Sequence, residues 1–320
     1  MSPIIASPRR VRLAPDWLPN TNHIGFYVAQ AKGYYADEGL YLEILPFDGE
    51  AMPNRKIVTG DTEFGLMPQQ SILTLRARGV DVVSVAALIQ PNTTTLAVRA
   101  DSGITRPREL AGRRYASYGT EFEVAMIEAM IVADGGTGAP ARVDAEKLDI
   151  LPALFDGTVD IAWGFYAWEG IQAELRGQAL RHFFVAEHGV PKEYFPLLFT
   201  TQDYASRESS LVRAFARATG RGYAEAAAHP SVAAELFLAS APTSELPDAA
   251  DALVRRSMTW LAPRMGERAQ RDGVTRPWGW HDEEMWATFA AFARRLAAEH
   301  GLTSPAPDAE TAGYTNGFVR

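Results

Sequence analysis

Residues 16–35 read DWLPNTNHIGFYVAQAKGYY, a polar and aromatic segment that runs into an apolar stretch with helical spacing. The NTN at 20–22 is suited to cap a helix start and Gly33 to end the helix, so a helix is predicted over 22–35. The preceding VRLA at 11–14 predicts a short strand. A loop rich in hydrogen-bonding groups then follows the carboxyl end of a strand, where open α/β sheets bind their ligands.

The composition is that of an ordinary globular protein with an acidic balance. Hydrophobic residues make up 47% of the 320 residues and charged residues 22%, which argues against disorder. The formal net charge of −8 gives no electrostatic footprint for nucleic acid, so no nucleic-acid partner is expected. Cysteine is absent, which excludes disulfides, thiolate nucleophiles and cysteine-ligated metal clusters. No window reaches the roughly 18 consecutive apolar residues of a membrane helix, so no membrane insertion is predicted.

Strand-like and helix-like segments alternate along the chain, and this alternation predicts an α/β architecture. Strands are expected at 11–14, 41–45, 63–67, 82–88, 95–99, 114–117, 159–163 and 197–201. Helices are expected at 22–35, 50–59, 69–78, 107–111, 121–134, 145–155, 168–176, 207–228, 230–240, 247–262 and 282–299.

Two segments share one local pattern, in which a helix end is followed by a glycine, an acidic residue and a strand. They are RKIVTGDTEFG at 55–65 and LPALFDGTVDIA at 151–162. Gly60 and Gly157 are predicted to take the positive φ that ends a helix. Any turn from a helix to a strand can look like this, but the similar lead-in and the spacing fit two similar lobes.

The two lobes are expected to be joined by two apolar, threonine-containing strands, TLAV at 95–98 and LLFTT at 197–201. The first lobe would then comprise 1–97 plus 198–320, with the second lobe, 98–197, inserted into it. The alanine-rich C-terminal helices are expected to support the first lobe.

Four motifs point to a known family. The most specific is DWLPNTNHIGFYVAQAKGYYADEGL at 16–40, and the others are GDTEFGL at 60–66, ASYGTEFEVAMIEAM at 116–130 and DIAWGFYAWEGIQAELRG at 160–177. Over nearly its whole length the chain resembles the family that joins thiamine pyrimidine synthases with the substrate-binding proteins of pyrimidine-precursor, riboflavin, taurine and sulfonate importers. The resemblance implies the two-lobed α/β fold of type II periplasmic binding proteins, with the ligand in the interlobe cleft.

The sequence departs from the synthase branch of this family. That branch uses a lysine that binds pyridoxal phosphate, a nearby histidine and a cysteine-rich iron-binding run. After Gly65 this chain continues LMPQQS at 66–71, which contains neither Lys nor His, and the chain has no Cys. His23 is shared by both branches and does not restore the enzyme. The resemblance therefore implies a binding protein that uses no cofactor, rather than a synthase.

Candidate ligand-binding residues follow the first predicted strand. The carboxylate of Asp16 can accept from an amine and the indole of Trp17 can stack on a ring, although a capping Asp and a core Trp would look the same. Asn20, Asn22 and His23 can hydrogen-bond a ligand, while capping the helix is the default role of Asn at this place.

Two further pairs of candidates lie at predicted helix starts. Gln69 and Gln70 can read donors and acceptors on the edge of a ring, and the alternative is a solvated helix start. Tyr118 and Gly119 precede the helix at 121–134, whose free amides can contact a ligand.

The densest cluster of aromatic and acidic residues contains Trp163, Tyr166 and Glu169, with Trp168 between them. We expect Tyr166 to face Trp17 across the cleft and to sandwich a planar ring, while Glu169 or Asp16 accepts from its amine. Packing between the lobes is the alternative for these aromatic side chains.

The remaining aromatic group is predicted to have a structural role. Trp278, Trp280 and His281 are expected to pack the C-terminal helices. No set of His, Asp and Glu has metal-ligand spacing, and no phosphate-binding loop or Ser-His-Asp signature is present.

The leading functional prediction is a solute-binding protein that closes two lobes over a small neutral or amine-bearing heterocycle. A thiamine pyrimidine precursor fits the resemblance best, and riboflavin is the nearest rival. A small sulfonate fits less well, because acidic residues lie at the start of the helix that would hold it. The second class is a cytosolic enzyme of pyrimidine synthesis with a different cofactor anchor.

The resemblance also implies a partner and a compartment. A binding protein of this family is periplasmic or lies at the cell surface, and it delivers its ligand to an ABC permease. The N-terminal MSPIIASPRRVRL has its apolar patch before its arginines, which is the reverse of a secretory signal. If the chain starts at Met1, the sequence therefore predicts a cytoplasmic protein.

Overall fold

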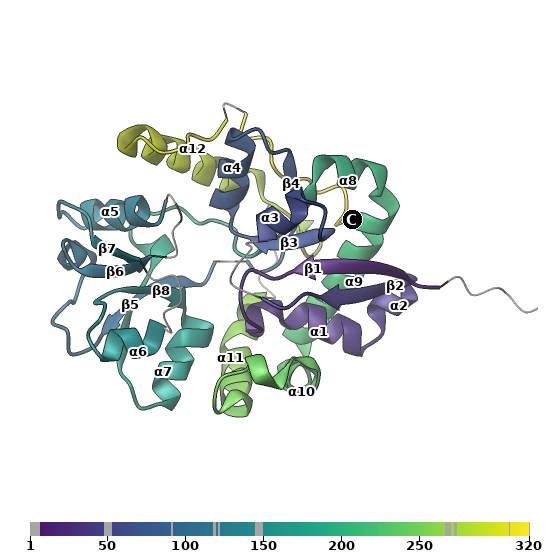
Figure 1. Ribbon diagram of the computed structural model, residues 1–320, viewed down its shortest axis with the longest axis horizontal. Coiled ribbons are helices and arrows are strands. Elements are labelled where there is room, and N and C mark those ends of the chain that lie inside the picture. The colour runs from purple at the N-terminus through teal and green to yellow at the C-terminus, as the bar shows by residue number, and fades with distance from the viewer. Residues whose placement is uncertain are drawn as a thin grey trace, which may run out of the picture.

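The computed structural model of the chain contains two groups of β-strands, one in each half of the molecule, and both are covered by helices (Figure 1). The structure describes residues 7–47, 53–90, 92–117, 120, 122–144, 150–265, 270–271, 274–306 and 308–319.

The first sheet has five strands in the order β2-β1-β3-β10-β4. They are β1 (Arg9–Ala14), β2 (Leu40–Ile44), β3 (Phe64–Met67), β4 (Val82–Ala87) and β10 (Leu197–Thr201). β1 pairs in parallel with β2 and β3, whereas β10 is antiparallel to β3 and to β4. The chain therefore leaves this sheet after β4 and returns to it only for β10.

The second half of the molecule contains the intervening strands. They are β5 (Thr94–Arg99), β6 (Arg114–Ser117), β7 (Ala141–Asp144), β8 (Ala162–Phe165) and β9 (Leu180–Phe184). β5 lies between β8 and β9 and is antiparallel to both, and β6 is parallel to β7. An isolated bridge between Tyr115 of β6 and Ile161, the residue before β8, connects the three-stranded sheet β8-β5-β9 with the pair β6-β7.

Helices cover both sheets, and two of them connect the halves. Those of the first half are α1 (Ile24–Ala31), α2 (Tyr34–Asp37), α3 (Pro53–Val58), α4 (Gln69–Ala77), α8 (Gln202–Arg207), α9 (Ser209–Ala228) and α10 (Pro230–Ser240). Those of the second half are α5 (Glu123–Ala133), α6 (Ile150–Phe155) and α7 (Ile171–Leu175). α11 (Ala250–Met265) contacts α10 and α7, and α12 (Glu283–His300) contacts α4 and α5.

Short elements complete the fold. The 3₁₀ turns are η1 (Thr21–His23), η2 (Pro107–Leu110), η4 (Val185–Glu187) and η5 (Thr243–Glu245), and η3 (Tyr166–Gly170) is a turn of π-helix. A hairpin of β11 (Gln270–Arg271) and β12 (Val274–Thr275) lies between α11 and α12.

The structure corrects the helix predicted at 22–35. The segment begins with the 3₁₀ turn η1, α1 ends at Ala31, and Gly33 adopts a left-handed conformation with φ of 74° before α2. Gly33 therefore interrupts the helical segment instead of closing it. At Gly60 and Gly157, φ is 77° and 79°, as the repeated pattern predicts.

The structure also corrects the expected crossing and part of the strand assignment. β5 pairs along its length with β8 and β9, so the chain has already crossed to the second sheet before Thr94 and not at 95–98. β7 (ARVD) and β9 (LRHFF) were not predicted from the sequence, because they are short and contain charged residues that break the apolar pattern. Because α11 and α12 contact both halves, the C-terminal helices support more than the first lobe.

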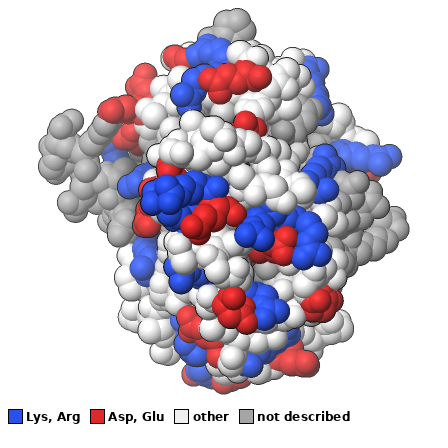
Figure 2. Space-filling model, turned by 90° about the vertical axis from the view of Figure 1, so that its left-hand side faces the viewer, with Lys and Arg blue, Asp and Glu red and all other residues white. Residues whose placement is uncertain are grey.

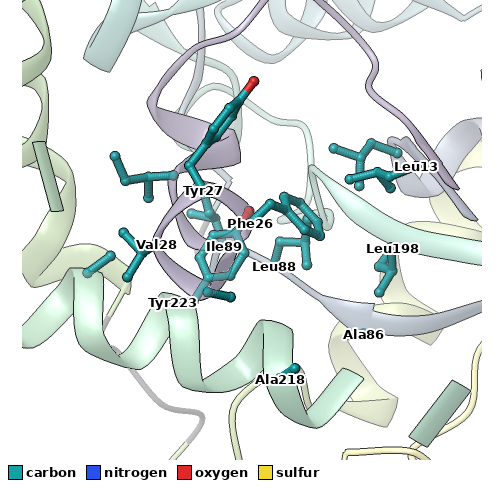
Figure 3. Packing of buried hydrophobic residues seen from close by; sticks show 14 of the residues in the cluster. Leu13, Phe26, Tyr27, Val28, Ala86, Leu88, Ile89, Leu198, Ala218 and Tyr223 are labelled. Carbon is teal, nitrogen blue, oxygen red and sulfur yellow. The ribbon is translucent and has the colours of Figure 1, made fainter. Parts of the chain in front are cut away.

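A close contact between α1 and α9 lies in the largest apolar cluster (Figure 3). The rings of Phe26 and Tyr223 meet edge to face, with centroids 5.7 Å apart. A Cβ built on Gly222 would lie 2.0 Å from the carbonyl oxygen of Gly25, and one built on Gly25 would lie 2.0 Å from the ring of Tyr223. Both glycines are therefore required for this helix spacing.

Charged side chains of both signs are interspersed on the face that the second half presents in Figure 2, with no large region of one sign. Ion pairs in this half include Arg99 with Asp101 at 2.6 Å and Arg114 with Asp160 at 2.8 Å. Within the described ranges, no helix is long and apolar enough to cross a membrane.

A buried histidine links the C-terminal tail to β4. His281 Nε2 lies 2.8 Å from Ser84 Oγ, and His281 Nδ1 lies 3.1 Å from Asn316 Oδ1. Nδ1–H donates to the amide oxygen, so Nε2 accepts from the hydroxyl. Burial lowers the pKa of His281 to about 4, although the contact with Asn316 opposes this shift. Trp278 stacks on Tyr223 of α9 with centroids 4.9 Å apart, and the ring of His281 lies 5.8 Å from that of Trp286 on α12. Trp278 and His281 therefore pack against C-terminal helices, as predicted.

Acid is expected to destabilise the protein through His281. A histidine in the unfolded chain has a pKa near about 6.5, so from there down to about pH 4 the unfolded state binds a proton that the folded state does not. The free energy of unfolding should fall by up to about 1.4 kcal/mol per pH unit over this range from this group. In urea unfolding, His281→Gln should reduce the slope, whereas His229→Gln at an exposed position should not. Equal slopes in the two variants would contradict this assignment.

Candidate functional site

Four segments of the chain meet at one edge of the first sheet. β1 and β3 are parallel, so the loops that follow them leave the sheet at the same edge. β10 is antiparallel and enters at this edge, where Leu197 pairs with Met67 of β3 and with Ala87 of β4. The segments that meet there are 15–23, 68–70, 88–90 with 92–93, and 190–196. The last two are the crossings between the sheets, so this edge faces the second half.

The loop after β1 contains a buried acid–histidine pair. His23 Nε2 lies 2.8 Å from Asp16 Oδ1, and His23 is only 3% exposed. Asn20 caps η1, because its Oδ1 accepts from the backbone N–H of Asn22 at 2.9 Å and its Nδ2 donates to the carbonyl of Leu18 at 2.9 Å. Asn20 therefore has the capping role. The second carboxylate oxygen of Asp16, Oδ2, has no hydrogen-bond partner among the described residues.

Helix α11 contacts both this loop and η3. Thr21 Oγ1 lies 2.6 Å from Ser257 Oγ of α11, and the ring of Trp260 lies 5.0 Å from that of Tyr166. Ser257 and Trp260 are three residues apart, which is about one helical turn. The two predicted groups of site residues, far apart in sequence, are thus held against neighbouring turns of one helix.

The rings of Trp17 and Tyr166 have different partners in this structure. Trp17 packs against Phe47 with centroids 4.9 Å apart at 42°. Tyr166 packs against His182 with centroids 5.0 Å apart, and its hydroxyl donates to Glu174 at 2.7 Å. The sandwich of Trp17 and Tyr166 around a ligand ring therefore stays a prediction.

Glu169 is held in the turn of π-helix. Its Oε2 accepts from the backbone N–H of Phe165 at 2.8 Å, and a Cβ built on Gly164 would lie 3.0 Å from this oxygen. Such π-helical turns are frequent at functional sites. Trp163 lies opposite Leu96 in the second sheet and packs against its apolar cluster, which is the packing alternative for this residue.

The two glutamines after β3 differ in their contacts. Gln69 is fully buried, its Nε2 donates to the carbonyl of Trp286 at 3.0 Å, and its Oε1 accepts from the N–H of Tyr194 at 3.3 Å. This carboxamide links α4 to α12 and to the second crossing, which is a structural role. Gln70 is 6% exposed, and its carboxamide has no hydrogen-bond partner in the described part of the chain.

Tyr118 and Gly119 lie outside the described residues, so their predicted contacts stay predictions. The neighbouring Glu123, in the first turn of α5, is 5% exposed. Its carboxylate accepts from Ser117 Oγ at 2.8 Å and from Tyr115 Oη at 3.0 Å. A carboxylate of the chain itself therefore lies at the start of α5.

Glu193, a buried acid in the second crossing, was not predicted from the sequence. It is 4% exposed, and its Oε1 accepts from Asn92 Nδ2 of the first crossing at 3.2 Å. Its Oε2 is buried without a hydrogen-bond partner among the described residues. The backbone amide of Gln70 stabilises its charged form, but burial raises the pKa of Glu193 to about 8. In the sequence, Glu193 lies between two prolines in a connection without periodicity, so no local pattern marks it.

Several polar groups where the four segments meet have no hydrogen-bond partner among the described residues. They are Asp16 Oδ2, Glu193 Oε2 and the carboxamides of Asn22 and Gln70, and all four belong to residues that are largely buried. Buried polar groups are normally hydrogen-bonded, so these four groups are candidates to bind a polar ligand. Other buried polar atoms without a partner among the described residues lie outside these segments, for example in Gln178 and Trp278. No group of three or more His, Asp or Glu with metal-binding geometry is present in the described ranges.

Three relatives resemble the chain over most of its length. The formylaminopyrimidine-binding protein of Halalkalibacterium halodurans is 24% identical over 277 residues, covering 86% of this chain and 82% of the relative. The riboflavin-binding protein RibY of Chloroflexus aurantiacus is 26% identical, and the match covers 97% of this chain and 86% of the relative. The 4-amino-5-hydroxymethyl-2-methylpyrimidine phosphate synthase of Legionella pneumophila is 26% identical, and the match covers 74% of this chain and 76% of the relative.

Solved structures share the fold at low sequence identity. The alkanesulfonate-binding protein SsuA from Xanthomonas axonopodis pv. citri has a TM-score of 0.69 at 15% identity, over 93% of this chain and 95% of that one. A Candida albicans protein described as having the generic periplasmic binding protein fold has a TM-score of 0.67 at 12% identity, over 97% of each chain. The fold is therefore the two-lobed α/β fold of periplasmic binding proteins, as predicted. The chain belongs to the NMT1/THI5-like family, which matches residues 20–233.

Proposed function

We propose that this chain is a solute-binding protein that captures a thiamine pyrimidine precursor for an ABC importer. The observation that supports it best is the set of largely buried polar groups, without partners among the described residues, at the sheet edge that faces the second lobe. Ligands of α/β proteins bind at the carboxyl ends of strands, and two-lobed proteins close around them. The similarity to a formylaminopyrimidine-binding protein supports the choice of ligand.

The proposed ligand is a planar ring that bears an amine. Trp17 forms one wall by stacking, and Tyr166 on η3 contributes the aromatic side of the second lobe. Asp16 or Glu169 accepts from the amine. The remaining proposed ligand contacts come from Asn22, Gln70, His23, Trp163, Tyr118 and Gly119. Asn20 and Gln69 instead orient the backbone around the site.

An anionic ligand is disfavoured at the start of α5 by a carboxyl group of the protein itself. Glu123 lies in the first turn of α5. Helix N-termini are the usual places for a sulfonate or phosphate, and here this one already has an acidic side chain beside it. The start of α5 therefore differs in charge from what a sulfonate-binding protein of the same fold would need.

Riboflavin remains the alternative ligand within the same class. It is supported by the 26% identity to a riboflavin-binding protein over nearly the whole chain. Its isoalloxazine ring would use the same aromatic walls but lacks the exocyclic amine that Asp16 or Glu169 would bind.

The enzyme alternative is supported by the 26% identity to a pyrimidine phosphate synthase. Against it, β3 ends at Met67 and continues through Pro68 to Ser71, with no lysine or histidine to hold pyridoxal phosphate. A visible absorption band that shifts on adding pyridoxal phosphate, followed by stoichiometric labelling of one lysine with borohydride, would favour the enzyme.

The lobe boundaries and the partner belong to the same proposal. We place the two hinge segments at 88–90 with 92–93 and at 190–196, so that 94–189 forms the inserted lobe, while the chain on both sides forms the first lobe. A lobe motion about these crossings would close the site. The partner would be an ABC permease and the location periplasmic or at the cell surface.

Mass spectrometry of ligand released from native protein, together with calorimetric titration, tests the proposal. We expect micromolar or tighter binding of formylaminopyrimidine or 4-amino-5-hydroxymethyl-2-methylpyrimidine, and much weaker binding of riboflavin and of taurine. Tight binding of riboflavin alone would overturn the ligand and leave the class of protein. Absence of binding to every compound would overturn the function.

A further inference from the structure

We propose that Glu193 reads the ligand ring directly, by pairing its two carboxyl oxygens with an N–C–NH₂ edge such as that of a 4-aminopyrimidine. This inference rests on the proposed function and adds to it a specificity-determining residue. Such an edge presents a ring nitrogen that accepts and an amine that donates. A carboxylic acid presents the complementary pair, with one oxygen that accepts and one O–H that donates.

The contacts of Asn92 determine which oxygen has which role. Asn92 Oδ1 accepts from the backbone N–H of Thr94 at 2.9 Å and from its hydroxyl at 2.5 Å. The amide orientation that satisfies these bonds turns Nδ2 toward Glu193, where it donates to Oε1 at 3.2 Å. Oε1 is therefore an acceptor, with a lone pair left for the ligand amine. Oε2, which has no partner in the described part of the chain, is the oxygen that carries the proton.

The environment of Glu193 favours the protonated acid. The pKa of Glu193 is raised to about 8 by burial, and only the backbone amide of Gln70 opposes the shift. The groups that face it from α4 and from the first crossing, Gln70 and Asn92, are uncharged. Burial raises the pKa of the following Tyr194 beyond the pH range of the experiment. At neutral pH the carboxyl is mostly neutral, so it can donate to a ring nitrogen.

The geometry of the amine leaves room for both acidic contacts. A primary amine on a ring has two N–H groups, one on the side of the ring nitrogen and one on the other side. The first pairs with Oε1 of Glu193 while Oε2–H donates to the ring nitrogen. The second remains for Asp16 or Glu169.

Titration calorimetry with 4-amino-5-hydroxymethyl-2-methylpyrimidine from about pH 7 to about pH 10 tests the inference. In the unsubstituted protein, affinity should be nearly constant up to about pH 8 and then fall toward tenfold per pH unit, because the ionised acid has no proton to donate. Glu193→Gln keeps one donor and one acceptor, so it should bind within about threefold of the unsubstituted protein at pH 7 and lose the alkaline fall. Glu193→Met has neither and should bind about ten- to a hundredfold more weakly.

Lys192→Met is the matched control, since Lys192 is the exposed neighbour of Glu193 in the same crossing. It should leave both the affinity and the pH profile unchanged. Thermal melts of each variant verify folding. If the unsubstituted protein binds the pyrimidine but Glu193→Met binds equally well, or if Glu193→Gln retains the alkaline fall, this inference is wrong and the proposed function stands. If the unsubstituted protein does not bind the pyrimidine at pH 7, the proposed ligand and this inference are both wrong.

Discussion

Gly222→Ala is expected to destabilise the protein by about 3 kcal/mol or more, because the added methyl group has no space. A Cβ at this position would lie 2.0 Å from the carbonyl oxygen of Gly25 and 2.8 Å from the Cβ of Ala29. Both atoms belong to α1: one is a backbone oxygen and the other is a Cβ fixed to the backbone. Neither can rotate away as the end of a flexible side chain can. The two helices must separate or the variant must unfold, which urea unfolding measures directly.

Ser210→Ala is the matched control for this prediction, since Ser210 lies on α9 at an exposed position. It should change the free energy of unfolding by no more than about 0.5 kcal/mol. The effect of Gly222→Ala should also reach the candidate site, because the hydroxyl of the adjacent Tyr223 donates to the carbonyl of Asn22 at 2.5 Å. A Gly222→Ala protein with unchanged stability would show that α1 and α9 do not approach this closely.

Trp17→Ala is expected to weaken binding of a 4-aminopyrimidine at least tenfold. Stacking contributes about 0.5–1.5 kcal/mol beyond the area that the ring buries, and about 1.4 kcal/mol is a factor of ten. Glu169→Gln should weaken binding about ten- to a hundredfold, because a hydrogen bond to a charged group contributes about 1.5–3 kcal/mol. Calorimetric titration of both variants beside the unsubstituted protein gives these ratios.

Two controls separate loss of the site from loss of the fold. Tyr41→Ala removes an aromatic ring that is 54% exposed on β2 and should leave affinity unchanged, because Tyr41 pairs with Arg10 near the start of β1, whereas Trp17 follows the end of that strand. Trp17→Phe retains a stacking face and should recover much of the loss. If Trp17→Ala and Glu169→Gln both bind the native ligand like the unsubstituted protein, the proposed site is wrong even if the ligand is right.

The elements with strong local signals could be predicted from the sequence. β1, β3, β6 and β10 lie within about two residues of their predicted positions, because short apolar runs bounded by turn residues are typical of strands. The cap at Asn20 and the positive φ at Gly60 and Gly157 follow from what these residue types do in any protein.

The site could be predicted only in part. The loop with Asp16 and His23 is a local feature, and the structure pairs these two side chains. The partners of Tyr166 are Trp260 and His182, which approach it from α11 and β9, and neither was predicted to be there. β9 was itself missed, so its neighbours could not be inferred.

The sequence by itself determined the α/β class, the absence of cysteine chemistry, the family and the polar loop after the first strand. These properties depend on composition, on periodicity and on residues close together in the chain. Only the tertiary structure decided that Glu193 lies between Asn92 and Gln70, that the first crossing precedes Thr94, and that α11 contacts both groups of site residues. The physical reason is that these contacts join segments distant in sequence. The antiparallel pairing of β10 with β3 and β4, which brings the second crossing to the sheet edge, is one example that no local pattern specifies.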